Sequence, residues 1–516
     1  MRFSLASVGA MLAFGATRYA LAAESRVIGY YASWKQQQSV GIDFSKYTHI
    51  NLSFGVPAKD GSISFDKTLS LPDIIGQIHG NKTKVLVSLG GWSDSTYFTS
   101  LVSDTTATNP FITNIVKFVE TNKLDGIDID WEYPGGAGNG CNNPDLAKDT
   151  PNYLKFLQNL RAAFTSKFGA GKKLITMAVY LQPFVVNGTP ITDVSEFAKV
   201  VDYANLMQYD INGAWNNVTG PNAPLNFQNG EATQLSFTTA IDAWTGAGWP
   251  ASQLNAGLAF YGRSTTALED MTQDPKNQYQ AQEKGVIPPG DKEDGLWADP
   301  CTSVKSYSGI WQWKHLRDQG VLTNPTTAGS TWVRQWDPVS QTPWLFNPST
   351  KRFISYEDPT SIAAKVKYAL EKGLGGTMVW AVYMDYNNEL LDTVLTTIQG
   401  GDSDSGSSQD PSDSSIDNYS AAHVDDYSAS PFDDYSASPF DDYSAVDHIE
   451  YNYDGSSNHK DGAPCSNEYD YVCGSNGRSP DYYLCLHGLW TKLSCGIGTV
   501  CQQQSNAISC GWASTS

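Results

Sequence analysis

Residues 24 to about 400 alternate between short apolar runs and longer amphipathic stretches. Eight of the apolar runs have the length and the near-continuous hydrophobicity of parallel strands that are covered on both faces. They are residues 27–34, 48–56, 84–92, 126–133, 174–181, 203–210, 255–262 and 375–385. Eight such strands separated by helical segments predict an α/β fold, a closed (β/α)8 TIM barrel. A doubly wound open sheet is the alternative, but it usually has fewer strands and a glycine-rich phosphate loop, and none is evident here.

The interval between the seventh and eighth predicted strands is too long for one helix. Residues 265 to about 358 contain several aromatic, strand-like patches, which predict a small α+β insertion at the rim of the barrel. A helix is then expected to begin near Asp358 and Pro359, with proline at an early helical position, and to end at Gly373.

Three further segments differ in composition from the predicted barrel domain, residues 24–400. Residues 1–23 have a basic start, an apolar stretch and small residues near Ala22, which predict a signal peptide. Residues 401–462 repeat the unit DDYSASPF and are rich in Asp and Ser, which predicts a disordered acidic linker. Residues 463–516 form a cysteine-rich segment, which we expect to be a small carbohydrate-binding module.

The eight cysteines favour an oxidising compartment. Six of them lie in residues 463–516 and predict three disulfides; a zinc site is the alternative, but no CxxC pair occurs there. Cys141 and Cys301 fall in predicted loops on one side of the fold and could pair. Sequons begin at five asparagines, of which the first lies inside an apolar run and is expected to be unmodified: Asn51, Asn81, Asn187, Asn217 and Asn418.

The negative charge belongs mostly to the linker. The formal net charge is −20, and residues 400–462 contribute −14 of it, with fifteen acidic residues against one lysine. Such acidity argues against nucleic acid and anionic membranes as partners. No apolar run is long enough to span a bilayer. We therefore expect a secreted, extracellular protein, a monomer, that could associate with a cell wall.

The candidate chemistry is concentrated in the segment DGIDIDWEYP, residues 125–134. Side chains alternate along a strand, so Asp128, Asp130 and Glu132 are predicted to share one face. Carboxylates packed so closely raise one another's pKa, which gives a general acid that stays protonated near working pH. Asp125 is outside this alternation; we expect it to cap the start of the strand, and a catalytic role is the alternative.

Other polar and aromatic residues fall where predicted strands end, which is where barrel enzymes hold their reactive groups. They comprise carboxylates, phenols, indoles and one guanidinium, a set that suits a carbohydrate cleft better than a phosphate site: Trp92, Tyr209, Asp210, Tyr261, Arg263, Trp380 and Asp385. The seven histidines show no paired spacing on a strand, so we predict no metal and no cofactor.

These motifs closely resemble glycoside hydrolase family 18, the chitinases. The resemblance covers residues 26 to about 398, and the signature DxxDxDxE is complete from Asp125 to Glu132. Further matches are SLGGW at 88–92, MQYD at 207–210, YGR at 261–263 and Trp380 in the last predicted strand. The long insertion resembles that of the family's deep-cleft branch.

The resemblance implies a role for each matching residue. Glu132 would protonate the glycosidic oxygen, while the substrate's own acetamido oxygen attacks the anomeric carbon. Asp130 would hold the acetamido N–H and orient Glu132, Asp128 would share a proton with Asp130, and Tyr209 would donate to the acetamido oxygen. The implied substrate-binding residues are Tyr30, Phe54, Trp92, Tyr133, Met207, Asp210, Arg263 and Trp380.

Several of these residues have simpler interpretations. Packing alone is the alternative for Trp92 and Trp380, whereas barrel filling is the favoured role of Met207 and a substrate contact is its alternative. A rim ion pair is the alternative for Arg263.

The sequence thus predicts a secreted chitinase whose partners are chitin and chito-oligosaccharides. A weaker resemblance, through residues 484–501, links the last segment to fungal chitin-binding modules. The alternatives are a chitin-binding lectin on an inactive barrel and an endo-β-N-acetylglucosaminidase acting on N-glycans. Glu132 and its partners disfavour the first, and the insertion and terminal module disfavour the second.

Overall fold

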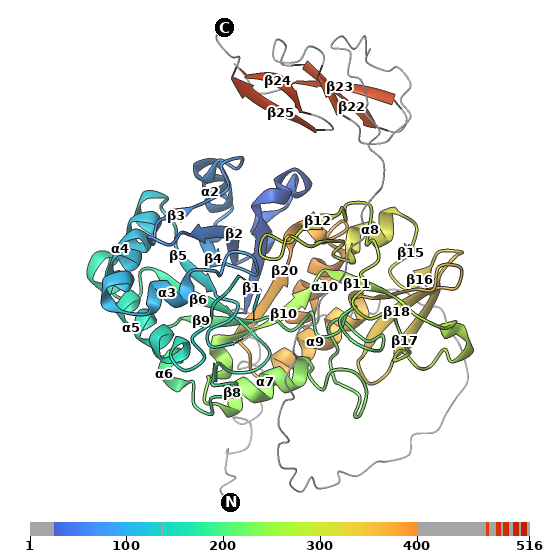
Figure 1. The fold of residues 1–516 in the computed structure, drawn as a ribbon, viewed down its shortest axis with the longest axis horizontal. Coiled ribbons are helices and arrows are strands. Elements are labelled where there is room, and N and C mark those ends of the chain that lie inside the picture. The colour runs from blue at the N-terminus through green and yellow to red at the C-terminus, as the bar shows by residue number, and fades with distance from the viewer. Residues whose placement is uncertain are drawn as a thin grey trace, which may run out of the picture. The chain divides into compact units, whose positions relative to one another are not determined.

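The computed structural model describes residues 25–136, 138–139, 141–400 and five strands between residues 471 and 512. These residues fall into two compact units, one within residues 1–410 and one within residues 411–516 (Figure 1). The predicted signal peptide (1–23), the predicted linker (401–462) and the sequon at Asn418 lie outside the described residues.

The first unit is built on a closed barrel of eight parallel strands. They are β1 (Arg26–Ala32), β2 (His49–Pro57), β4 (Lys84–Gly90), β5 (Gly126–Asp130), β6 (Leu174–Val179), β9 (Tyr203–Leu206), β10 (Leu254–Ala259) and β20 (Gly376–Trp380). Each strand pairs with the next in this order, and β20 pairs with β1 to close the sheet. The predicted (β/α)8 barrel is confirmed.

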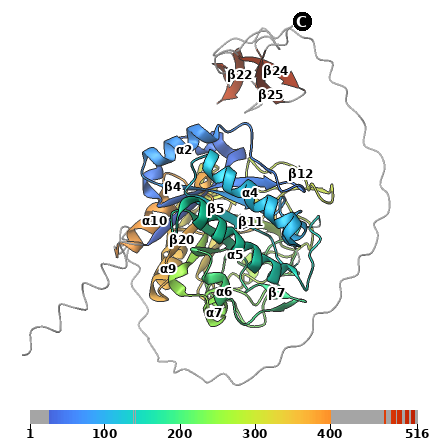
Figure 2. The same cartoon turned by 90° about the vertical axis from the view of Figure 1, so that its left-hand side faces the viewer.

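Helices surround the barrel and bury an apolar layer against its outer face (Figures 1 and 2). They are α2 (Leu71–Gly80), α3 (Phe98–Val102), α4 (Thr105–Thr121), α5 (Asp149–Phe168), α6 (Ser195–Ala198), α7 (Phe237–Gly246), α9 (Pro359–Glu371) and α10 (Glu389–Ile398). Helix α9 begins as predicted, because the Asp358 carboxylate accepts the N–H groups of Thr360 and Ser361.

Several barrel strands end earlier than their apolar runs predict. Strand β5 ends at Asp130, so Glu132 lies in the following loop rather than on the strand. Strand β9 likewise ends before Tyr209, and β20 ends at Trp380. The predicted strands are too long because the apolar pattern continues past the last residue that is hydrogen-bonded to a neighbouring strand. Asp385 does not end a strand; its carboxylate accepts N–H groups at the start of α10.

An insertion separates β10 from β20. Its main sheet is antiparallel, in the order β14 (Ile310–Gln312), β11 (Tyr261–Thr266), β19 (Arg352–Ser355), β18 (Thr342–Asn347) and β17 (Val333–Asp337). The insertion also holds α8 (Trp313–Asp318) and the hairpins β12 (Trp297–Ala298)–β13 (Lys305–Ser306) and β15 (Leu322–Asn324)–β16 (Thr327–Ala328). Its sheet starts at Tyr261 rather than near residue 265, because the apolar run at 255–262 changes sheet after Ala259.

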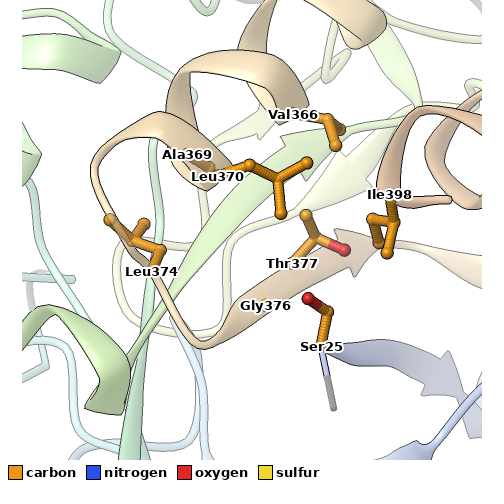
Figure 3. Close-up of a pocket in the computed structure, with 8 residues that line it drawn as sticks. All are labelled: Ser25, Val366, Ala369, Leu370, Leu374, Gly376, Thr377 and Ile398. Atoms are coloured by element: carbon orange, nitrogen blue, oxygen red, sulfur yellow. The ribbon is translucent and has the colours of Figure 1, made fainter. Parts of the chain in front are cut away.

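Two small pairings complete the first unit: β3 (Ile63–Ser64) beside β2, and the hairpin β7 (Val185–Val186)–β8 (Thr189–Pro190). Within the described ranges, every helix is too short or too polar to span a bilayer. Figure 3 shows a mainly apolar hollow between α9, α10 and the start of β20. Gly376 lines the hollow and Trp380 lies at the other end of β20, so the hollow is at the opposite end of the barrel from the site described below.

The five described strands of the second unit form two small antiparallel sheets. One comprises β21 (Tyr471–Cys473), β22 (Asp481–Leu486) and β23 (Leu489–Ser494), and the other β24 (Thr499–Gln504) and β25 (Ala507–Trp512). Cys473 is buried and disulfide-bonded. The side chains of the other five cysteines predicted to form bridges here lie outside the described residues.

Candidate active site

Asp128 is held inside the barrel by hydroxyl groups from three other strands. Its carboxylate accepts hydrogen bonds from Tyr30 Oη and Ser88 Oγ at 2.8 Å and from Thr176 Oγ1 at 2.5 Å. Burial still raises the pKa of Asp128. The three donors therefore fix the position of the carboxyl group, and their hydrogen bonds lower its pKa against the effect of burial.

Asp130 lies two residues further along β5 and is only 3% exposed. Burial, together with the charges of Glu132 and Asp128, raises the pKa of Asp130 well above its usual range. Its Oδ1 has no hydrogen-bond partner among the described residues. Buried polar atoms are normally paired, so this oxygen is available to a bound molecule.

Glu132 lies in the loop directly after β5 and is half-buried. Burial raises the pKa of Glu132 to about 7, and the negative charge of Asp210 contributes to the rise. A carboxyl group with this pKa can both donate and accept a proton near neutral pH, which is the requirement for general acid–base catalysis.

The backbone of Glu132 is fixed on both sides. Its N–H donates to Ser95 Oγ at 3.0 Å, and its carbonyl accepts from Asn142 Nδ2 at 2.7 Å. Ser95 Oγ in turn donates to the carbonyl of Gly91 at 2.8 Å. Sequence reasoning missed Ser95 and Asn142, because both act on backbone atoms and depend on a loop conformation that no motif specifies.

Two glycines of the SLGGW segment allow the end of the third barrel strand to approach its neighbours on both sides, β5 and β2. Gly90 and Gly91 have φ values of +105° and +83°. A Cβ atom on Gly90 would lie 2.3 Å from the carbonyl oxygen of Asp130, and one on Gly91 would lie 2.7 Å from the ring of Phe54. Both the left-handed conformation and the close approach therefore require glycine.

Aromatic rings gather at the end of β20. The Trp380 ring is stacked on Phe54 with centroids 5.9 Å apart, and it lies 5.7 Å from the ring of Tyr30. Trp34 completes the group at 6.5 Å and is half-exposed. Sequence reasoning brought Trp380, Phe54 and Tyr30 to this site but missed Trp34, although it ends the first predicted strand.

Tyr209, Asp210 and Arg263 form a further part of the site, and Tyr209 packs against the same interior cluster as Trp380. Burial, with the charges of Asp130 and Asp210, raises the pKa of Tyr209 well above its usual range, so its phenol stays a hydrogen-bond donor. Asp210 Oδ1 accepts from Tyr261 Oη and from Arg263 Nε, each at 2.6 Å. The rim ion pair considered for Arg263 is thus present, and its guanidinium also lies 5.3 Å from the ring of Trp215.

The remaining candidates lie around this centre. Met207 is half-buried against Tyr30, Tyr203 and Met378 inside the barrel, which supports the filling role. The Tyr133 ring lies 5.1 Å from Tyr180, and Trp92 is half-exposed.

Asp125 is remote from the centre. It precedes β5, and its Oδ2 accepts the N–H of Val85 at 2.8 Å and lies 2.8 Å from His79 Nε2. This geometry makes it a structural cap. Among the described residues, no group of three or more His, Cys, Asp or Glu side chains is arranged to hold a metal ion.

Comparison with known proteins identifies this arrangement. The sequence model of "Glycosyl hydrolases family 18" matches residues 26–385, which is more than half of the chain. The chain belongs to glycoside hydrolase family 18. Residues 26–385 form a family 18 chitinase domain, and the protein is a glycoside hydrolase.

Individual relatives agree with the family assignment. A "chitinase-like effector" of Moniliophthora roreri is 34% identical over 378 residues, which cover 71% of this chain and 91% of the relative. "Chitinase 1" of Aphanocladium album is 29% identical and covers 68% of this chain and 79% of its own. The crystal structure of a chitinase from Rhizomucor miehei is 34% identical with a TM-score of 0.66, and the match covers 72% of this chain and 99% of that structure.

A disulfide joins the loop after Glu132 to the insertion of this family 18 domain. Cys141 and Cys301 are bonded, with Cα atoms 4.9 Å apart, which confirms the pairing considered from the sequence. Cys141 immediately precedes Asn142, whose amide holds the carbonyl of Glu132. The insertion is therefore covalently connected to the loop that positions the catalytic candidate.

Proposed function

We propose that the protein hydrolyses β-1,4-linked N-acetylglucosamine polymers, with Glu132 as general acid and base. The observation that carries the proposal is the juxtaposition of two carboxyl groups. Glu132 has a pKa of about 7, and buried Asp130 beside it presents an oxygen without a partner. Family membership and the names of the relatives, including "Chitinase 1", support chitin as the substrate.

The reaction we propose proceeds in two steps and retains the anomeric configuration. In the first, Glu132 gives its proton to the glycosidic oxygen, the bond to the anomeric carbon breaks, and the substrate's acetamido oxygen bonds to that carbon. An oxazolinium ion results. In the second step, the Glu132 carboxylate takes a proton from water, whose oxygen attacks the anomeric carbon and reopens the ring.

The neighbouring groups match the needs of this nucleophile. The free Oδ1 of Asp130 would accept the acetamido N–H, which holds the amide in the attacking orientation. Asp128 would share a proton with Asp130, because the two carboxyl groups lie on the same buried face of β5. The Tyr209 hydroxyl would donate to the acetamido oxygen. A tethered nucleophile gains a large effective molarity over a separate one.

The proposal predicts a loss of activity as pH rises. Glu132 must be protonated to donate, and its raised pKa of about 7 places the change near neutrality. We expect kcat/KM on a soluble chito-oligosaccharide to be high below pH 6 and to fall tenfold per pH unit above about pH 7. Because Glu132 and Asp130 interact, the midpoint belongs to the pair. A profile that stays flat between pH 6 and pH 9 contradicts the assignment.

A binding protein without turnover is the second candidate. It is favoured by the name "chitinase-like effector" given to the relative from Moniliophthora roreri. The presence of Glu132 with a pKa poised near neutrality favours the enzyme. The two candidates predict the same binding of chitin and differ only in turnover.

Incubation with two polymers tests the proposal against both of its rivals. We expect soluble oligosaccharides to be released from colloidal chitin, while a high-mannose glycoprotein stays intact under the same conditions. Products can be measured by mass spectrometry. Binding of chitin without any release would support the lectin, and removal of the N-glycans would support the endo-β-N-acetylglucosaminidase.

We also propose that the protein is secreted and acts as a monomer outside the cell. The Cys141–Cys301 disulfide is typical of oxidising compartments. Three of the predicted sequons have exposed asparagines, Asn81, Asn187 and Asn217, whereas Asn51 is buried.

The second unit, with its small sheets and disulfide-bonded Cys473, would keep the enzyme close to insoluble chitin by tethering.

A further inference from the structure

A chain of hydrogen bonds crosses the interior of the barrel and ends at Asp128. Arg26 Nε donates to Asn255 Oδ1 at 2.8 Å, and Asn255 Nδ2 donates to Asn205 Oδ1 at 2.9 Å. Asn205 Nδ2 donates to Tyr30 Oη at 3.1 Å, and Tyr30 Oη donates to Asp128 Oδ2 at 2.8 Å. Both asparagines are completely buried. Side chains alone thus join β1, β10, β9 and β5.

Arg26 lies at the end of the barrel opposite the active site. It is the first residue of β1 and pairs with Gly376, which lines the hollow in Figure 3. Tyr30 is four residues further along this strand, a distance of about 13 Å. Arg26 Nη2 also donates to the carbonyl of Ser252 at 2.7 Å, and the guanidinium lies 4.8 Å from the centroid of the Tyr203 ring. These contacts fix Arg26 where a substrate in the active site does not reach it.

The chemistry of Arg26 sets the direction of the bonds in this chain. A guanidinium has donors and no acceptor, whereas an amide can turn over and exchange its donor with its acceptor. Because Arg26 donates, Asn255 presents its oxygen to the guanidinium and its nitrogen to Asn205. Asn205 then presents its nitrogen to Tyr30, and the Tyr30 hydrogen is directed to Asp128. Hydrogen bonds in such a buried chain also strengthen one another.

This direction opposes a proton on Oδ2 of Asp128. A protonated Oδ2 would donate to Tyr30, and the whole chain would have to reverse. Asn255 Nδ2 would then face Arg26 Nε, donor against donor. An unsatisfied buried donor is costly, so the proton shared by the two aspartates is favoured on Asp130.

We propose that Arg26 is a remote positioning residue of the active site, which directs the Tyr30 hydrogen onto Asp128 and thereby places the shared proton on Asp130. Arg26 acts through other side chains and does not contact the substrate. The catalytic consequence rests on the proposed function, whereas the direction of the hydrogen bonds does not.

The titratable neighbours of Asp128 among the described residues are Asp130 and four tyrosines. The tyrosines come from β1, α5, β9 and the segment after β9: Tyr30, Tyr153, Tyr203 and Tyr209. Burial raises the pKa of each tyrosine well above its usual range, so all four stay neutral. Asp130, whose pKa is also raised well above its usual range, takes the first proton of the pair. The second proton, bound at lower pH, therefore belongs to Asp128.

Infrared titration of the full-length protein tests the role of Arg26 without any need for turnover. Protonated carboxyl groups absorb apart from carboxylates, and subtraction of the matching Asp128→Asn protein isolates the low-pH step. We expect Arg26→Met to raise the midpoint of this step by about one pH unit, because a hydrogen bond to a charged group is weakened. Arg26→Lys, which also has only donors, should restore most of the difference. An unchanged midpoint in Arg26→Met overturns the proposal.

Arg161→Met is the matched control, because Arg161 lies at the same end of the barrel and outside the chain. Its Nε and Nη1 donate to the carbonyls of Val200 and Lys173, which precede β9 and β6. We expect Arg161→Met to lower the melting temperature and to leave the midpoint of Asp128 unchanged. An equal rise of the midpoint in Arg161→Met and Arg26→Met would show a general loosening of the barrel and would also overturn the proposal.

Asn255→Asp decides the matter even if Arg26→Met does not fold. An aspartate side chain has only acceptors, so it keeps Arg26 as an ion-pair partner and takes a hydrogen bond from Asn205. The Asn205 oxygen then faces Tyr30, and the chain reverses. The midpoint of Asp128 should rise by at least as much as in Arg26→Met, and an unchanged midpoint contradicts the proposal.

The pH profile of catalysis should follow the same shift. A raised midpoint means that Asp128 takes up its proton at higher pH, so the fall of kcat/KM at low pH should move upward by about one unit in Arg26→Met. The fall near pH 7, which belongs to Glu132, should stay in place. Absent turnover in the parent protein would refute the proposed function, while the infrared midpoint would still decide the role of Arg26.

Discussion

Turnover of chitohexaose is expected to fall by a factor of roughly 10³ or more when Glu132 is replaced by Gln, since general acid catalysis contributes about 10² to 10⁴ and this group serves in both steps. Glutamine has nearly the same shape as glutamic acid but cannot donate a proton to the glycosidic oxygen. The hydrogen bonds that fix this loop are made by the backbone of residue 132, to Ser95 and Asn142, so they persist in the variant. The measurement is product release under single-turnover conditions.

Binding separates a chemical loss from a structural one. The Glu132→Gln variant should bind chitohexaose with an affinity close to that of the parent protein, and calorimetry measures this directly. Glu283→Gln changes an exposed glutamate and should retain full activity. If Glu132→Gln retains activity within tenfold of the parent, another group supplies the proton and the proposed mechanism fails.

The strand pattern was sufficient to predict the barrel and part of its interior. Alternation along residues 126–130 placed Asp128 and Asp130 on one face, and the structure buries both inside the barrel. The same alternation wrongly extended the strand to Glu132. A sequence records which side chains are apolar, but a strand ends where its hydrogen-bonded neighbours end, and that depends on the whole sheet.

Residues that act through backbone atoms or across the insertion could not be predicted in this way. Ser95 and Asn142 hold the peptide groups of Glu132, and their residue types carry no signal of that role. The hydrogen-bond partners of Asp210 could be predicted in part from the sequence, because Tyr261 and Arg263 belong to a recognisable motif. Family resemblance supplied roles that periodicity alone could not, and these roles stay predictions until they are tested.

The insertion contributes to the site in two physically different ways. Arg263 and Tyr261 neutralise and orient Asp210 from the sheet that begins directly after β10. The disulfide acts from the other side, on the loop between Glu132 and α5. The insertion is thus attached to the site at two points, through the ion pair of Arg263 with Asp210 and through the disulfide, which joins residues 160 positions apart.

A substrate without acetamido groups should be almost inert. We expect cellohexaose, which has the same linkage and a hydroxyl group in place of each acetamido group, to be cleaved at least roughly 10³-fold more slowly than chitohexaose, because the tethered nucleophile is missing. Fully deacetylated chitohexaose should behave in the same way. The buried Asp130 oxygen and the Tyr209 hydroxyl would then also lack the amide that pairs with them. Initial rates by chromatography measure the difference.

The stereochemistry of the product provides an independent check on the same step. Attack by the acetamido oxygen followed by water inverts the anomeric carbon twice, so the first product from chitohexaose should be the β-anomer when followed by NMR. The control is the affinity of the Glu132→Gln variant for chitohexaose, cellohexaose and deacetylated chitohexaose. If the cleavage rates differ by a larger factor than these affinities, the excess belongs to the chemical step. Equal rates on all three hexamers, or an α-anomer as the first product, would show that water attacks directly and that Asp130 and Tyr209 have other roles.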